Sequence, residues 1–201
     1  MRNSIKKSLI IIGLTIAFSL FLYSSLFSEC KECIEVAKGN IPAKFLYPSL
    51  KELPSGIAIW DLEEAIQALK DEKGKYLWVD TRPGSFVKAG TVKNATHLVC
   101  DLKGTPIPED QHGPAFSQER LEAAIKQVDG DLNAVRVLFF CQGPECHRSY
   151  NAALRSVSEF GMDPSQIVWF RAGYPNLEKH ILDNPKLKRK IAHYLHGAIL
   201  N

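Results

Sequence analysis

Beyond its first seven residues, this chain of 201 residues has no excess of positive charge. It contains 25 Lys and Arg against 22 Asp and Glu. Arg2, Lys6 and Lys7 stand in an N-terminal stretch without an acid, and the remainder balances at 22 of each sign. Domains that bind nucleic acid usually carry a marked basic excess on one face. We therefore expect no nucleic-acid partner.

The chain also lacks the compositional bias of non-globular proteins. It is 45% hydrophobic and 23% charged, with 13 Gly and 11 Pro, which is close to an average globular protein. It has no internal repeat and no low-complexity segment. Disorder, collagen and coiled coil are excluded as descriptions of the whole chain. The length suits one domain with a sizeable core and a short appendage.

No charged residue occurs between Ser8 and Phe27. As a helix, rising about 1.5 Å per residue, this run would span roughly 30 Å, the thickness of a bilayer's hydrocarbon core. A basic start, an apolar run and small residues after it are typical of a secretory signal peptide, but no A-x-A cleavage site follows. Residues 1–28 are therefore predicted to be a signal peptide or an N-terminal membrane anchor. The basic residues before the run favour export of the rest, to the periplasm or another extracytoplasmic space.

Five cysteines follow this leader, and the odd number leaves at least one thiol free if the others pair within the chain. Cys30 and Cys33 form a C-K-E-C pair, which fits a structural disulfide, a redox dithiol or half of an intermolecular metal site. Residues 29–54 contain three prolines and few long apolar runs, and are predicted to be a tether. The domain itself is expected to occupy residues 55–201.

Short apolar runs alternate with helical stretches throughout this domain, which predicts an α/β fold built on a parallel sheet. The predicted strands are Ile57–Trp60, Tyr76–Val79, Leu98–Val99, Val135–Phe140 and Ile167–Phe170. The predicted helices cover 62–70 after an N-cap at Asp61, 118–128 after Ser117, 149–160 up to Gly161, and a basic region near the C-terminus that is expected to be a solvated face.

A cysteine, Cys141, follows the run Val135–Phe140, which is expected to be the central strand, buried on both faces. Ligands of open parallel sheets bind beyond the carboxyl ends of the strands. The unpaired amides and dipole of the next helix favour an anion there. Beside Arg148, the pKa of Cys141 is expected to fall from about 8.5 toward roughly 3.5 to 7.5. We therefore predict a thiolate at Cys141.

Three pieces of sequence together resemble the rhodanese (sulfurtransferase) family over about residues 55–180. The segment FFCQGPECHRS resembles the family's active-site loop, and VWFRAGYPNLE resembles its closing strand and glycine turn. The segment WVDTRPGSFVKAGTVKNATHL resembles its first signature, carried here by Asp80, Arg82, Phe86, Gly90, Val92 and Ala95. The resemblance implies an open parallel sheet flanked by helices on both faces.

The resemblance also implies a ping-pong transfer of sulfane sulfur. A thiolate at Cys141 would take the outer sulfur of a donor such as thiosulfate, and an acceptor would remove it from the persulfide. Arg148 would bind the donor's anionic end. The expected partners are a small sulfur-containing anion or a protein sulfur donor or acceptor, and no metal or organic cofactor is implied. The residues expected to line the substrate site are Gln142, Gly143, Glu145, His147 and Ser149.

The loop departs from the family pattern in length. Six residues separate Cys141 from Arg148, whereas the family loop has four and related cysteine phosphatases five. A phosphatase is disfavoured because Phe140 replaces the usual preceding His and Glu145 would repel a phosphate dianion. Cys146 is a second catalytic candidate, either as the nucleophile of a rearranged loop or as a resolving thiol that closes a disulfide with Cys141.

Two other functional classes remain open from the sequence: a non-catalytic sulfur-carrier or docking module, and a thiol redox protein that uses the two loop cysteines. Simpler roles are expected for several neighbours. Asp80 and Arg82 are predicted to pair structurally, Cys100 to lie in the core and His147 to lie at the surface. Ser149 is expected to be the helix N-cap, a participant in catalysis, or both.

Overall fold

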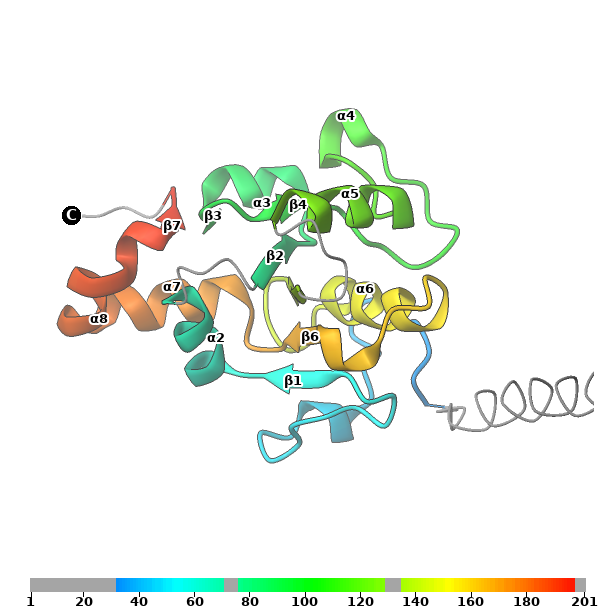
Figure 1. The fold of residues 1–201 in the computed structure, drawn as a ribbon, viewed down its shortest axis with the longest axis horizontal. Helices are drawn as coiled ribbons and strands as arrows, with labels where there is room; N and C mark the ends of the chain where they lie inside the picture. Colours follow the sequence, from blue (N-terminus) through cyan, green and yellow to red (C-terminus); the bar gives the residue numbers. More distant parts are fainter. Residues whose placement is uncertain (1–31, 71–75, 129–134, 198–201) are drawn as a thin grey trace, which may run out of the picture. The chain divides into compact units, whose positions relative to one another are not determined.

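A five-stranded parallel sheet organises the residues that the computed structural model describes, 32–70, 76–128 and 135–197 (Figure 1). The strand order is β1-β6-β5-β2-β4, so β5 lies at the centre. The sheet strands are β1 (Ala58–Trp60), β2 (Tyr76–Asp80), β4 (Thr96–His97), β5 (Arg136–Phe140) and β6 (Ile167–Phe170). Two further strands, β3 (Thr91–Val92) and β7 (Leu195–His196), form a separate antiparallel pair.

Helices cover both faces of the sheet. One face packs against α5 (Gln118–Val128) and α6 (His147–Ser158), and the other against α2 (Leu62–Leu69), α7 (Gly173–Asp183) and α8 (Pro185–Ile191). The remaining helices are α3 (Gly84–Ala89), α4 (Glu109–His112), η1 (Ala43–Leu46), η2 (Pro164–Gln166) and η3 (Ala192–Tyr194). This architecture confirms the predicted α/β fold, an open parallel sheet with helices on both faces.

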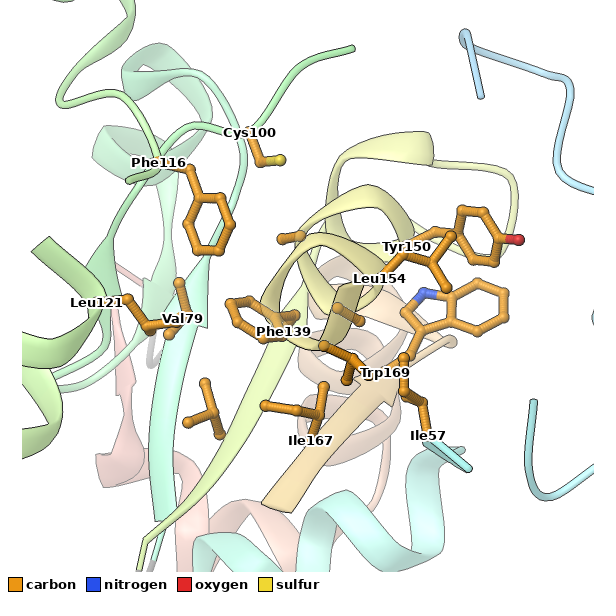
Figure 2. Packing of buried hydrophobic residues seen from close by; sticks show 14 of the residues in the cluster. Ile57, Val79, Cys100, Phe116, Leu121, Phe139, Tyr150, Leu154, Ile167 and Trp169 are labelled. Atoms are coloured by element: carbon orange, nitrogen blue, oxygen red, sulfur yellow. The ribbon is translucent and has the colours of Figure 1, made fainter. Parts of the chain in front are cut away.

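Large aromatic side chains fill the layer between the sheet and α6. Phe139 and Trp169 are register partners on β5 and β6, and both are fully buried. Tyr150 stacks edge-on against Trp169, with ring centroids 5.3 Å apart, and Figure 2 shows these side chains together with Leu154. Burying the aromatic faces removes apolar area from water, worth about 25 cal/mol per Å². The strand that precedes Cys141 is therefore packed firmly against α6.

The predicted strands match the structure closely except for the third. The strand expected at Leu98–Val99 is displaced to Thr96–His97, because the pairing with β2 ends where Leu98 N donates to Asp80 O at 3.0 Å. Leu98 and Val99 are buried all the same. The helix expected at 149–160 is also displaced, since α6 begins at His147 after an extended residue at Cys146.

Residues 33–53, predicted to belong to a tether, pack on the domain. Phe45 and Leu53 are each 1% exposed within the core cluster. Val36 forms two hydrogen bonds with Asn151 of α6, both 3.0 Å long. This part of the chain is therefore an N-terminal arm of the domain, and the name "arm" is used for it below.

The predicted leader and Cys30 lie outside the described residues. Cys33, at the start of the arm, is disulfide-bonded. Within the ranges 32–70, 76–128 and 135–197, no helix has both the length and the apolar character needed to cross a membrane.

Candidate active site

The loop that follows β5 is held in place by the turn that opens α7. The carbonyl of Cys141 accepts a hydrogen bond from the amide of Tyr174 at 2.9 Å. Gly173 has a φ of +76°, and a Cβ there would lie 2.5 Å from Gly143 N and 2.7 Å from Cys141 O. Only glycine combines this left-handed backbone with so close an approach. The glycine turn therefore positions the cysteine loop.

Cys141 and Cys146 form a disulfide that closes this loop, with Cα atoms 6.0 Å apart. Cys141 is 1% exposed, whereas Cys146 is half-buried and is the N-cap residue of α6. The Cys146 amide donates to Gly143 O at 3.0 Å, which tightens the loop further. The predicted thiolate at Cys141 therefore does not describe this oxidised state, and the prediction applies only after the disulfide is reduced.

Asp101, which lies after β4 in the chain, binds two side chains in the first turn of α6. Its Oδ1 lies 2.7 Å from Nε2 of His147, and its Oδ2 accepts from Nη2 of Arg148 at 2.8 Å. Burial alone would raise the pKa of Asp101, but the hydrogen bonds from His147 and the Leu102 amide, with the charge of Arg148, lower the pKa below its ordinary value. Asp101 is therefore a carboxylate that accepts only.

These contacts correct one expectation from the sequence and bear on a second. His147 is 3% exposed, so the prediction of a surface histidine is wrong. The reason is that α6 begins at His147 and turns its side chain toward Asp101. The guanidinium of Arg148 is bound to the same carboxylate, although the predicted role was to bind a donor anion.

Ser149 is neither the N-cap nor exposed. The N-cap is Cys146, and Ser149 is the third residue of the helix, 1% exposed. Its hydroxyl accepts a hydrogen bond from the Trp169 indole at 3.2 Å. The expectation of an N-cap is therefore wrong, because the helix begins two residues earlier than the sequence predicts.

A pocket of about 630 Å³ opens beside the half-buried Cys146. Among the predicted substrate-site residues, it is lined by Gln142, Gly143, Glu145 and His147, but not by Ser149. The other lining residues are Lys38, Leu46, Pro83, Phe86, Pro144, Cys146 and Arg148. Cys141 lies beneath the loop and does not line the pocket. In this oxidised state, Cys146 is therefore the loop cysteine that borders the pocket.

Three residues in and around α6 were not singled out from the sequence: Glu35, Asp101 and Arg155. Glu35 of the arm forms a bidentate pair with Arg155, both contacts at 2.7 Å, and Arg155 also donates to the carbonyl of Asp101 at 2.9 Å. Glu35 lies 120 positions from Arg155. Asp101 lies 46 positions from His147. Neither pair has a local sequence signal.

The buried pair at the end of β2 was predicted from the sequence and is confirmed. Arg82 Nη2 donates to Asp80 Oδ2 and to Gly90 O, each at 2.6 Å, and Thr91 Oγ1 donates to Asp80 at 2.7 Å. Both charges are paired inside the domain, so they hold the segment between β2 and β3 in place.

The predicted core position of Cys100 is also confirmed. Its thiol is free and fully buried, and burial raises its pKa to about 12. Across the described part of the chain, no group of three or more His, Cys, Asp or Glu side chains is arranged to hold a metal ion.

Comparison with known proteins gives similarity only among solved structures. No protein-family model matches the sequence, and no curated protein does. Ygr203w from Saccharomyces cerevisiae, a homologue of single-domain rhodanese and the Cdc25 phosphatase catalytic domain, is 19% identical with a TM-score of 0.46, covering 72% of this chain and 90% of that one.

Two other solved structures are similar to a comparable degree. The As–Sb reductase from Leishmania major is 16% identical with a TM-score of 0.45, covering 63% of this chain and 80% of its own. The BH2092 protein from Bacillus halodurans is 17% identical with a TM-score of 0.41, covering 60% and 71% respectively. At these levels of similarity, the activities of these proteins do not transfer to this chain.

Proposed function

We propose that this domain is a sulfurtransferase that works with two thiols, Cys141 as the acceptor of sulfane sulfur and Cys146 as the resolving thiol. The observation that carries the proposal is the disulfide between a cysteine fixed at the end of the central strand and a cysteine at a helix N-terminus beside a pocket. The two sulfurs are within bonding reach of each other, as a resolving step requires.

The proposed cycle begins with the reduced dithiol. The Cys141 thiolate attacks the outer sulfur of thiosulfate, the S–S bond of the donor breaks, and sulfite leaves, so that Cys141 carries a persulfide anion. Cys146 then attacks the Cys141 Sγ of the persulfide. The new disulfide forms, and the transferred sulfur leaves as hydrosulfide with the proton of the Cys146 thiol. An external thiol reductant, itself oxidised to a disulfide, restores the dithiol.

The unequal exposure of the two sulfurs supports this division of roles. We expect a reductant to meet the half-buried Cys146 before the buried Cys141. Attack at Cys146 expels Cys141 as the leaving thiolate, which is the state needed for the next donor. The helix N-terminus at Cys146 and the Lys38 ammonium at the pocket wall both favour an anionic donor, whereas Glu145 opposes one.

Cysteine variants of the full chain test this assignment. After reduction and removal of the reductant, we expect wild type and Cys146→Ser to gain one sulfur from thiosulfate with release of sulfite, and only wild type to release hydrosulfide afterwards. Cys141→Ser should gain no sulfur, and Cys100→Ala should behave as wild type. Intact mass and single-turnover assays of sulfite and sulfide measure these steps. Sulfur addition in Cys141→Ser equal to that in wild type would contradict the proposal.

The same disulfide favours a second candidate, a thiol–disulfide oxidoreductase that exchanges Cys141–Cys146 with a protein partner and carries no sulfane sulfur. This alternative predicts that the reduced domain reduces insulin disulfides and gains no sulfur from thiosulfate. Sulfur addition without insulin reduction excludes it.

We also propose that the domain is exported, and tethered to the membrane if the leader is retained. Disulfides at Cys33 and at Cys141–Cys146 support an oxidising compartment. Protease added to spheroplasts should digest the domain, and full protection until lysis would contradict export.

A further inference from the structure

A histidine that is bound to an aspartate directly follows the proposed resolving cysteine in the chain. His147 directly follows Cys146 in the chain, lines the same pocket and is 3% exposed. Its Nε2 lies 2.7 Å from Oδ1 of Asp101. Its Nδ1 is buried and has no hydrogen-bond partner among the described residues. Buried polar atoms are nearly always paired, so this nitrogen needs an explanation.

The contact with Asp101 determines which ring nitrogen carries the proton. A carboxylate can only accept, so in the neutral ring the hydrogen resides on Nε2, and we assign this tautomer from the hydrogen bond. Nδ1 is then left with a free lone pair, which makes it a proton acceptor. If Nδ1 accepts a proton, the Asp101 carboxylate stabilises the imidazolium that results.

The charges around His147 act in opposite directions. Asp101 favours the imidazolium, whereas Arg148, bound to the same carboxylate, and the positive end of α6 disfavour it. Glu145 and Lys38, at the pocket wall, carry opposite charges.

Two further titratable groups, Arg155 and Cys100, contact the backbone of Asp101. Arg155 donates to the Asp101 carbonyl and is itself neutralised by Glu35. Cys100, whose thiol lies close to this backbone, stays protonated because burial raises its pKa to about 12. Among the described side chains, Asp101 binds the ring and Arg148 binds the same carboxylate, so their charges oppose each other.

We propose that His147, oriented by Asp101, carries the proton of the Cys146 thiol during discharge of the persulfide, an inference that rests on the proposed sulfurtransferase cycle. Nδ1 of His147 takes the proton from the Cys146 thiol. The resulting thiolate forms the bond to Cys141 Sγ, the persulfide S–S bond breaks, and the electron pair leaves with the outer sulfur. The imidazolium then returns its proton to that sulfur, so hydrosulfide departs and the neutral ring is restored.

The two states of the loop explain why Nδ1 has no partner in the oxidised form. The disulfide holds the Cys146 sulfur against Cys141. In the persulfide state this bond is open, and the Cys146 side chain turns about its own torsion beside the adjacent His147. The unpaired nitrogen of the oxidised state is thus the proton acceptor of the reduced one.

Single-turnover measurements on His147→Gln test the inference. The Gln side-chain amide can still donate to Asp101 but supplies no base. We expect the ratio of the hydrosulfide-release rate to the sulfite-release rate to fall about 100-fold, the low end of typical general acid–base contributions. Asp101→Asn should lower the ratio less, because its amide oxygen still orients the ring without stabilising the imidazolium. The control is His180→Gln, the same change at an exposed histidine on α7 outside this pocket.

A second readout separates proton transfer from a structural role. In a Cys141→Ser background, the alkylation rate of Cys146 is followed against pH by peptide mass. With His147 present, the inflection should lie at least one pH unit below that of the His147→Gln variant. If His147→Gln does not fold, the alkylation of Cys146 is measured against pH in Asp101→Asn instead.

The outcomes distinguish this inference from the proposed function. If wild type takes no sulfur from thiosulfate, the proposed function fails. If wild type takes sulfur but His147→Gln keeps the wild-type rate ratio and alkylation profile, only the role of His147 is overturned.

Discussion

At the scale of single residues, the local environment separates the three described cysteines near the loop. Cys141 and Cys146 share a disulfide, whereas Cys100 is a free thiol in the core. The difference arises from position alone. Cys146 lies at a helix N-terminus beside a pocket, and Cys100 lies among apolar side chains that exclude water.

Burial predicts that Cys100 does not react in the folded protein. Desolvation raises the pKa of its thiol to about 12, so at pH 8 only roughly one molecule in ten thousand carries a thiolate. We expect iodoacetamide at pH 8 to modify Cys146 of the reduced native protein and to leave Cys100 unmodified. In guanidinium chloride both should react. Peptide mass spectrometry measures the two sites, and comparable native alkylation of Cys100 would contradict the burial argument.

At the scale of elements, the turn that opens α7 controls the loop that follows β5. The Tyr174 amide binds the Cys141 carbonyl, and Gly173 lies close to backbone atoms of Cys141 and Gly143, so these contacts do not depend on the loop's side chains. The cysteine loop, which leads into α6, and the α7 turn thus pack together as one unit at the carboxyl edge of the sheet.

Gly173→Ala is expected to disturb this unit. The added Cβ must occupy a position 2.5 Å from Gly143 N, and the residue keeps an unfavourable positive φ. We expect a loss of about 2–4 kcal/mol of stability and faster reduction of Cys141–Cys146 by dithiothreitol. Denaturant unfolding and a timed thiol-trapping assay measure the two effects.

Gly161→Ala is the matched control. Gly161 also has a positive φ, +68°, but a Cβ there meets nothing within 4 Å. The Gly161→Ala substitution should lower the free energy of unfolding by about 1–2 kcal/mol, because of its backbone conformation alone, and leave the reduction rate of the disulfide unchanged. Equal reduction rates in the two variants would show that the turn does not control the loop.

At the scale of the whole molecule, the arm is linked to the candidate site through Arg155 of α6. Glu35 binds Arg155 of α6 and also accepts from the Lys103 amide at 2.9 Å. Arg155 in turn donates to the backbone of Asp101. The arm, α6 and the segment after β4 are therefore joined by one largely buried charge pair.

Glu35→Gln should reveal how much this pair contributes. Its two side chains are largely buried, so removing one charge leaves Arg155 without full compensation, and we expect a loss of about 1.5–3 kcal/mol in the free energy of unfolding. Glu159→Gln breaks the exposed pair with Lys103 and should cost less than about 1 kcal/mol. Urea unfolding with the disulfides intact measures both, and equal losses would contradict a special role for the arm.

Much of the fold could be predicted from sequence because its signals are local. The apolar run ending at Phe140 predicts a central strand, and the cysteine that follows it is placed at the carboxyl edge of a parallel sheet. The start of α6 was misplaced because Ser149 offers a better N-cap than Cys146 by propensity. In the structure, the disulfide and the contacts of His147 override that propensity.

The alternation of strands and helices and the position of Cys141 follow from the amino-acid order alone, since hydrophobic periodicity is a property of neighbouring residues. The contacts of Asp101 with His147 and of Glu35 with Arg155 arise only when the chain is folded. These partners are far apart in the chain, and many other pairs of opposite charge were equally available. Packing of the arm and of the segment after β4 against α6 selects among them, because a charge that becomes buried must find its counter-charge there.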